Sequence, residues 1–260
     1  MVIHLNIEVG DYVTRKSYNN DTVFKVLSIT DDTVYLKGVY VRLYADSKIN
    51  DLKKVNEAKD DFKFLKSETD NREEYFYLPG KILHIDGDSE YLDKCLKFYK
   101  ENGVYAIGKK INEEEIANQI IPLLNEYRPD IVIITGHDAY YKKKGAKEDV
   151  NSYKNSKNFA KAIRAARKYE KSQEKLVIIA GACQSDYEEL IKAGANFASS
   201  PKRVNIHALD PAIIAISIAL TKRNLPIDIV NILEQTKYGS DGIGGIITNG
   251  LMYVGFPRWI

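Results

Sequence analysis

The sequence predicts a two-part α/β protein, in which a small all-β module precedes a larger domain built on a parallel sheet with helices on both faces. Residues 1–50 contain only short β-branched and aromatic runs divided by turn residues. From residue 80 to 260, short apolar runs alternate with stretches of helical periodicity, which is the pattern of βαβ units. Residues 51–79 are dense in charge, and we interpret them as a linker with room for a short helix.

The β module, residues 1–50, contains the runs IEVGDYVTRK, TVFKVLSI and TVYLKGVYVRLY. Turn signals at Tyr18–Asp21 and Thr30–Asp32 separate these runs. Several strands in so short a segment favour a small SH3-like β-barrel, which we expect to be an accessory or docking module.

The larger domain is expected to hold five strands, each followed by a helix. The expected strands are Lys81–Ile85, Val104–Ile107, Asp130–Thr135, Leu176–Ala180 and Asn196–Ala198. The expected helices are Ser89–Glu101, Glu113–Tyr127, Asn155–Tyr169, Tyr187–Ala193 and Pro211–Thr221. Beyond these elements we expect a helix near Asp228–Thr236, and Asn249-Gly250 between apolar runs predicts a hairpin.

Composition excludes several classes of function. With 38 Lys and Arg against 36 Asp and Glu, the net charge of +2 gives no argument for a nucleic-acid partner. Two cysteines are too few for an all-thiolate zinc site or a disulfide framework, and no C-x-x-C or H-E-x-x-H motif occurs. The most apolar stretch, Ala212–Leu220, is too short to span a bilayer, and the N-terminus lacks a signal-peptide pattern. We therefore expect a soluble cytoplasmic protein with no metal or organic cofactor and no membrane partner.

Reactive side chains follow two of the expected strands. His137 comes two residues after the end of the strand at residue 135, and Cys183 three residues after the end of the strand at residue 180. Because one helix joins these strands, we expect them to be neighbours, with both side chains at the carboxyl edge of the sheet. A nearby imidazole can take the thiol proton and later return a proton to a leaving amine. The pair predicts a Cys–His dyad, with the backbone N–H of Cys183 as an oxyanion donor.

The other histidines and the second cysteine have simpler explanations. Cys95 lies at helical spacing among apolar residues, which indicates a core position. We expect His4 and His84 to be structural. His207, in a loop, remains a candidate for a role in the site.

The chain resembles the caspase-like (clan CD) cysteine peptidases in having an apolar strand followed by His and an apolar strand followed by Ala-Cys. More closely, it resembles the YabG-type sporulation-specific proteases of endospore-forming bacteria. The segments that carry the resemblance are VGDYVTRKSYNND, LKGVYVRLYADS, KILHIDGDSEYL, ITGHDAYYKKK, NSYKNSKNFAKAIRAARKY, LVIIAGACQS and AGANFASSPKRVNIHALDP.

This resemblance implies a caspase-like, flavodoxin-like sheet with Cys183 as nucleophile and His137 as base. It implies protein substrates, namely spore coat and related proteins, and cleavage after basic residues, particularly Arg. It also implies self-processing, for which Arg72 in the linker is a candidate position. The expected location is the mother cell of the sporulating bacterium or the spore coat.

One departure from the caspase-like pattern concerns the oxyanion hole. Those enzymes usually have Gly directly after the histidine, whereas here Gly136 precedes His137 and Asp138 follows it. The oxyanion candidates are therefore Gly136, Asp138 and Cys183. Asp138 can instead orient the imidazole or contact a basic side chain.

A preference for basic residues would require a carboxylate in the substrate pocket. Asp86 and Asp88, directly after the first strand of the sheet, are the first candidates, and Asp138 and Asp210 follow. The alternative is that the Asp-Gly-Asp turn only caps the next helix.

Three other functions are compatible with these residues. In an amidotransferase-like cysteine hydrolase, the histidine would follow the cysteine in the chain, and His207 would be the base. In a receiver-like signalling domain, Asp86, Asp88, Asp138 and Lys202 would form a magnesium and phosphate site. In the third, residues 1–50 would be a docking module on an inert domain.

Overall fold

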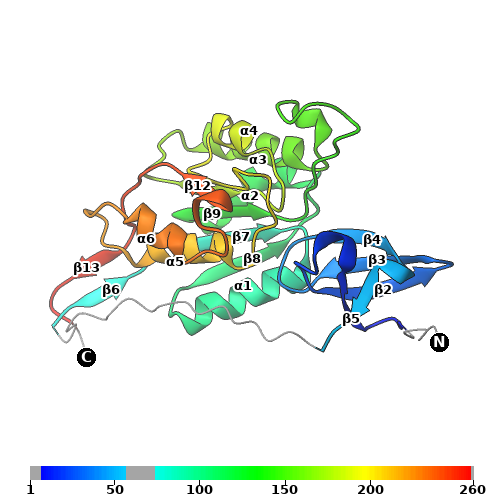
Figure 1. Cartoon of the computed structure of the whole chain (residues 1–260). Coiled ribbons are helices and arrows are strands. Elements are labelled where there is room, and N and C mark those ends of the chain that lie inside the picture. Colours follow the sequence, from blue (N-terminus) through cyan, green and yellow to red (C-terminus); the bar gives the residue numbers. More distant parts are fainter. Residues whose placement is uncertain (1–6, 57–73, 259–260) are drawn as a thin grey trace. The chain divides into compact units, whose positions relative to one another are not determined.

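The computed structural model describes residues 7–56 and 74–258, and the chain divides into two compact units, Met1–Phe62 and Lys63–Ile260 (Figure 1). The first unit holds a five-stranded antiparallel sheet, and the second holds a six-stranded sheet with helices packed against it. The predicted α/β class, with a mostly parallel sheet flanked by helices, is confirmed.

The sheet of the first unit has the strand order β4-β3-β2-β1-β5. Its strands are β1 (Tyr12–Arg15), β2 (Phe24–Thr30), β3 (Thr33–Gly38), β4 (Tyr44–Lys48) and β5 (Leu52–Lys54). Alternate residues such as Val13, Val34 and Leu36 are buried, as a sheet with one apolar face requires. Within residues 7–56, β4 and β5 are edge strands with no ladder between them, so the predicted closed SH3-like barrel is not confirmed. The sheet also extends past residue 50, because Leu52 of β5 pairs with Arg15.

The sheet of the second unit has the order β12-β11-β10-β9-β7-β8. Its strands are β7 (Ile82–Asp86), β8 (Ala106–Lys110), β9 (Ile131–Thr135), β10 (Val177–Ala180), β11 (Phe197–Ser199) and β12 (Ile243–Gly245). The first five are parallel, and β12 is antiparallel to β11. Every residue of β7, β9 and β10 is buried. Burial on both faces explains why these strands are continuous apolar runs rather than alternating ones.

Helices cover both faces of this sheet (Figure 1). They are α1 (Ser89–Glu101), α2 (Ile116–Tyr127), α3 (Ser156–Tyr169), α4 (Tyr187–Lys192), α5 (Asp210–Leu220) and α6 (Ile229–Glu234). One apolar core joins α2, α3 and α4 to side chains such as Val132 and Ile134. A second core joins α1, α5 and α6 to Ile131 and Ile133 on the opposite face. No helix in the described ranges is long and apolar enough to cross a membrane.

Two sequence predictions for this unit differ from the structure, namely the start of α2 and the pairing of the C-terminal segment. Helix α2 begins at Ile116 rather than Glu113, so Glu113 lies in the loop after β8. The hairpin predicted at Asn249-Gly250 is wrong. Strand β13 (Tyr253–Gly255) pairs with β6 (Phe76–Leu78), which lies in the segment expected to be a linker.

Gly250 lies at a close packing contact between two backbone segments and is not part of a hairpin turn. A Cβ at this position would lie 2.1 Å from the carbonyl oxygen of Thr221. Its N–H donates to the carbonyl of Leu225. The glycine therefore allows the C-terminal segment to approach the loop after α5, because only a residue without a side chain fits there.

Arg167, in the last turn of α3, connects the helix to the entry of β10 and the turn before β11. It donates hydrogen bonds to the carbonyl oxygens of Glu170, Ser172, Leu176 and Gly194 and to the side chain of Asn196. The side-chain oxygen of Asn196 in turn accepts from the backbone N–H of Ile178 in β10, and the backbone N–H of Asn196 donates to the carbonyl oxygen of Ile178. One guanidinium thus holds three segments together, which a lysine with a single ammonium group cannot reproduce.

We predict that Arg167→Lys lowers the free energy of unfolding by about 2–3 kcal/mol, because several partly buried carbonyl groups lose their donors. Urea denaturation followed by circular dichroism measures this loss. Arg164→Lys on the same helix is the matched control, since Arg164 forms a partly exposed ion pair with Glu189 and should cost less than about 0.5 kcal/mol. Equal losses in the two variants would contradict the structural role given to Arg167.

Candidate active site

Neighbouring strands β9 and β10 carry His137 and Cys183 to the same edge of the sheet. The ladder between these parallel strands pairs Ile134 with Ala180, and each candidate residue lies three positions beyond its member of that pair. The prediction that these strands are neighbours is confirmed. Adjacent strands are about 4.8 Å apart, so the register brings both loops to one level of the rim. The pairing of the two side chains as a dyad stays a prediction.

Gly181 begins the turn that carries Cys183 away from β10. Its φ of +106° lies in the left-handed region, where a residue with a side chain is strained. A Cβ there would also lie 2.9 Å from Leu190 and 3.1 Å from the side chain of Ser199. The chain therefore leaves the sheet sharply at this point, and the small residue is required by both conformation and space.

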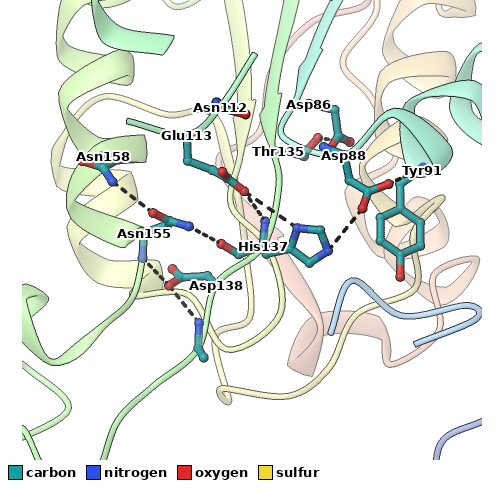
Figure 2. Close-up of polar contacts among 12 residues, drawn as sticks. Asp86, Asp88, Tyr91, Asn112, Glu113, Thr135, His137, Asp138, Asn155 and Asn158 are labelled. Carbon is teal, nitrogen blue, oxygen red and sulfur yellow. Dashed lines mark hydrogen bonds and ion pairs between the residues drawn. The ribbon is translucent and has the colours of Figure 1, made fainter. Parts of the chain in front are cut away.

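The imidazole of His137 lies between two carboxylates (Figure 2). Its Nδ1 is 3.8 Å from Oε1 of Glu113, and its Nε2 is 3.7 Å from Oδ2 of Asp88. The same Oε1 of Glu113 accepts a hydrogen bond of 2.8 Å from the backbone N–H of His137. The ring centre of Tyr91 lies 5.7 Å from that of the imidazole. Negative charge therefore stands on both sides of a ring that becomes positive when it takes a second proton.

Glu113 is a site residue that the sequence prediction missed. Two glycines make room for its carboxylate, because a Cβ on either Gly87 or Gly136 would lie 2.3 Å from Oε1. Glu113 reaches the rim from the loop after β8, a strand end that the prediction did not consider. Its place at the carboxyl end of a parallel strand is the signal that could have identified it.

Asp88 has two structural contacts in addition to its position beside His137. Its Oδ1 accepts hydrogen bonds from the backbone N–H groups of Glu90 and Tyr91, which caps α1 as the helix-capping alternative proposes. Its other oxygen, Oδ2, is the one near the imidazole. The Asp88 carboxylate thus caps the N-terminus of α1 with one oxygen and faces His137 with the other.

Asp86, the other acid of the Asp-Gly-Asp turn, is fully buried. It accepts hydrogen bonds from the backbone N–H of Asp88 at 2.9 Å and from Oγ1 of Thr135 at 2.8 Å. Thr135 also contacts His84, whose other ring nitrogen contacts the hydroxyl of Tyr99. The burial of His84 agrees with its predicted structural role. Asp86 thus belongs to an internal polar network beneath the rim.

Asp138 is buried, and both of its carboxylate oxygens accept hydrogen bonds. Oδ1 accepts from the backbone N–H groups of Ala139 and Asn155, at 2.9 and 2.7 Å. Oδ2 accepts from the hydroxyls of Ser156 and Ser185. Burial raises the pKa of this carboxyl group, and these hydrogen bonds oppose the rise because they stabilise the charged form. The carboxylate is directed into the protein, between α3 and the loop that carries Cys183.

The two cysteines contact one short segment of the second unit. Sγ of Cys183 lies 3.6 Å from the carbonyl oxygen of Ile206, and Sγ of Cys95 lies 3.5 Å from that of Ala208. Both cysteines are buried, and Cys95 packs in the core between α1 and the sheet as predicted.

His207 lies between these two contact points in the chain. Its backbone N–H donates to Asp210, and its Nδ1 accepts from the backbone N–H of Leu209. Burial raises the pKa of the Asp210 carboxyl, which is fully enclosed. The group of this segment that lies 3.6 Å from Sγ of Cys183 is the carbonyl oxygen of Ile206, the residue before His207.

Comparison with known proteins gives a consistent result. The family model described as YabG peptidase U57 matches residues 8–70 and 58–257. The sporulation-specific protease YabG of Bacillus subtilis (strain 168) is 42% identical over an alignment of 286 positions, which covers 97% of this chain and 99% of that protein. A match of this extent includes both units of the structure and the strands that carry His137 and Cys183. The chain therefore belongs to the YabG peptidase family and is a protease of sporulation.

Proposed function

We propose that this protease is a cysteine peptidase of caspase-like fold in which Cys183 is the nucleophile and His137 the proton carrier. The observation that supports this most directly is the β9–β10 register. Ile134 pairs with Ala180, and His137 and Cys183 each lie three positions beyond this pair. The carboxylates of Asp88 and Glu113 beside the imidazole add to it. Membership in a peptidase family argues against the receiver-like and inert-domain alternatives.

In the proposed reaction, His137 takes the proton of the Cys183 thiol, and the resulting thiolate attacks the carbonyl carbon of the substrate. The carbonyl oxygen becomes an oxyanion, and the C–N bond then breaks as the imidazolium gives its proton to the departing amine. Water, deprotonated by the same imidazole, hydrolyses the thioester. Asp88 and Glu113 favour each step that forms imidazolium, because their negative charge lies within 4 Å of its nitrogens.

The oxyanion donors are proposed among backbone groups. The N–H of His137 already donates to Glu113. The candidates are the backbone N–H groups of Gly136, Asp138 and Cys183. We favour Cys183, since the N–H of the nucleophile itself is nearest to the carbonyl under attack.

For cleavage after basic residues, we propose Asp88 as the carboxylate at the rim, because its Oδ2 lies 3.7 Å from the imidazole of His137, whereas Asp86 and Asp138 belong to networks inside the protein. A cavity of about 320 Å³ beside α4 offers further acidic groups, among them Asp186 and Glu188. In the structure these two already contact the guanidinium of Arg203. Spore coat and related proteins in the mother cell are the proposed substrates.

We predict that Cys183→Ala and His137→Ala abolish proteolysis, because each removes one partner of the thiolate-forming pair. The assay is incubation with a mixed protein substrate, followed by mass spectrometry of the new termini, which also gives the residue before each cut. Cys95→Ala is the matched control for loss of a buried thiol and should remain active. Loss of activity in His207→Ala but not in His137→Ala would support the amidotransferase-like order of residues instead.

We predict that Glu113→Gln lowers kcat about tenfold and Glu113→Ala lowers it further. The amide oxygen of Gln can still accept the N–H of His137, but its charge beside Nδ1 is gone, whereas Ala loses both contacts. Steady-state kinetics on a peptide that spans a mapped cleavage site measure this order. Glu114→Gln and Glu114→Ala, at the exposed neighbouring position, should leave kcat unchanged. Wild-type kcat in both Glu113 variants would contradict this role.

For self-processing, we propose a cut in residues 51–79. Arg72, the candidate position, lies outside the described residues. Prolonged incubation of the active enzyme should produce fragments that end in this segment, and Cys183→Ala should remain intact. Mass spectrometry of the products decides the matter, and an intact segment in the active enzyme would count against the proposal.

A further inference from the structure

The carboxylate of Asp138 joins three segments that are distant in sequence. Its hydrogen bonds reach Ala139 in its own loop, Asn155 and Ser156 at the start of α3, and Ser185 in the loop after β10. These residues lie up to 47 positions apart. Figure 2 shows part of this arrangement around Asn155 and Asp138. In the proposed mechanism no step uses the Asp138 side chain.

Each hydroxyl that donates to Asp138 also accepts a hydrogen bond from a backbone N–H group of the loop after β10. The hydroxyl of Ser185 accepts the N–H of Ala182 at 2.9 Å. The hydroxyl of Ser156 accepts the N–H of Asp186 at 2.7 Å. Cys183 therefore lies within a turn that is closed between Ala182 and Ser185 and held on its far side at Asp186.

The same group of contacts holds the loop of His137. Asp138 is the next residue in the chain, and the side-chain amide of Asn155 donates to the carbonyl oxygen of His137 at 2.8 Å. A continuous path of hydrogen bonds thus leads from His137 through Asn155 and Asp138 to Ser185 and the turn that contains Cys183.

We propose that Asp138 is a positioning residue, which fixes the two loops of the Cys–His pair relative to each other through the hydroxyls of Ser185 and Ser156. This inference rests on the proposed function, because it concerns the geometry of that pair. In the proposed reaction the side chain of Asp138 touches no reacting atom and acts through the loops. Displacement of a catalytic group by about 1 Å can cost 100-fold in rate, so a rigid connection between the loops serves the reaction directly.

The chemistry of the site explains why the residue is an aspartate. All four groups around the carboxylate are donors, and each serine hydroxyl has its single proton directed to Oδ2. In Asp138→Asn, the amide oxygen can replace Oδ1 and keep both backbone contacts, but an NH₂ group then faces two hydroxyl protons. The substitution therefore disrupts the connection to Ser156 and Ser185, while it preserves the size of the side chain and the two backbone hydrogen bonds at Oδ1.

The test compares Asp138→Asn, Ser185→Ala and the double variant by steady-state kinetics on a peptide that spans a mapped cleavage site. We expect each single variant to lower kcat by about 10- to 100-fold, with KM changed less than about twofold, because binding surfaces are intact and alignment is lost. The double variant should lose no more than the more affected single variant, since both substitutions break the same connection. Ser217→Ala, which removes a hydroxyl bonded within α5, is the matched control and should have the kcat of the wild type.

Unfolding midpoints in urea distinguish positioning from general destabilisation. A loss of kcat in Ser185→Ala that exceeds tenfold, at an unfolding midpoint equal to that of Ser217→Ala, supports the inference. If Asp138→Asn fails to fold, Ser185→Ala and Ser156→Ala decide the question, because they leave the carboxylate and its backbone contacts in place.

Two results would overturn the inference, and Cys183→Ala separates them. If Cys183→Ala is inactive and Ser185→Ala has wild-type kcat, the proposed dyad stands and the positioning role is wrong. If Cys183→Ala cleaves as well as the wild type, the proposed function fails, and the inference fails with it.

Discussion

The parallel ladder between β9 and β10 is the constraint on which the rest of the site depends. It pairs Ile134 with Ala180 and is buried on both faces by helices. Because side chains of a strand alternate between faces, a shift of one residue would move each side chain into the opposite core, where its shape no longer fits the packing. The same register that protects the core therefore also determines which residues emerge together at the rim. Stability and function are set here by one interaction.

Three carboxylates at this rim have distinct tasks that follow from their neighbours. Asp88 and Glu113 stand on opposite sides of the imidazole of His137, where charge is useful to a ring that gains a proton. Asp138 is buried, and burial of a charge is costly unless donors surround it. Two backbone N–H groups and two hydroxyls supply that compensation. Its role is accordingly to hold segments together.

Small residues make this arrangement of acids possible. Gly87 and Gly136 lie where any side chain would collide with the carboxylate of Glu113, and Gly181 supplies the left-handed turn before Cys183. A closely packed rim of this kind leaves little freedom to the loops. The hydrogen bonds of Arg167 stabilise the opposite end of β10 in the same way.

The sequence by itself determined the five parallel strands of the second unit, the helices between them and the two residues proposed for catalysis. Helical and strand periodicities are local, so α1 could be bounded at Ser89 and Glu101 from the printed residues alone. The order of strands and helix along the chain was enough to predict that the strands before His137 and Cys183 are neighbours in the sheet. Tertiary structure decided the contacts across the carboxyl edge of that sheet, because the partners of a carboxylate lie far away in the chain. Glu113 meets His137 across 24 residues and Asp138 meets Ser185 across 47. For the same reason Asn249-Gly250 resembled a hairpin turn in the sequence, whereas in the folded chain β13 pairs with the distant β6.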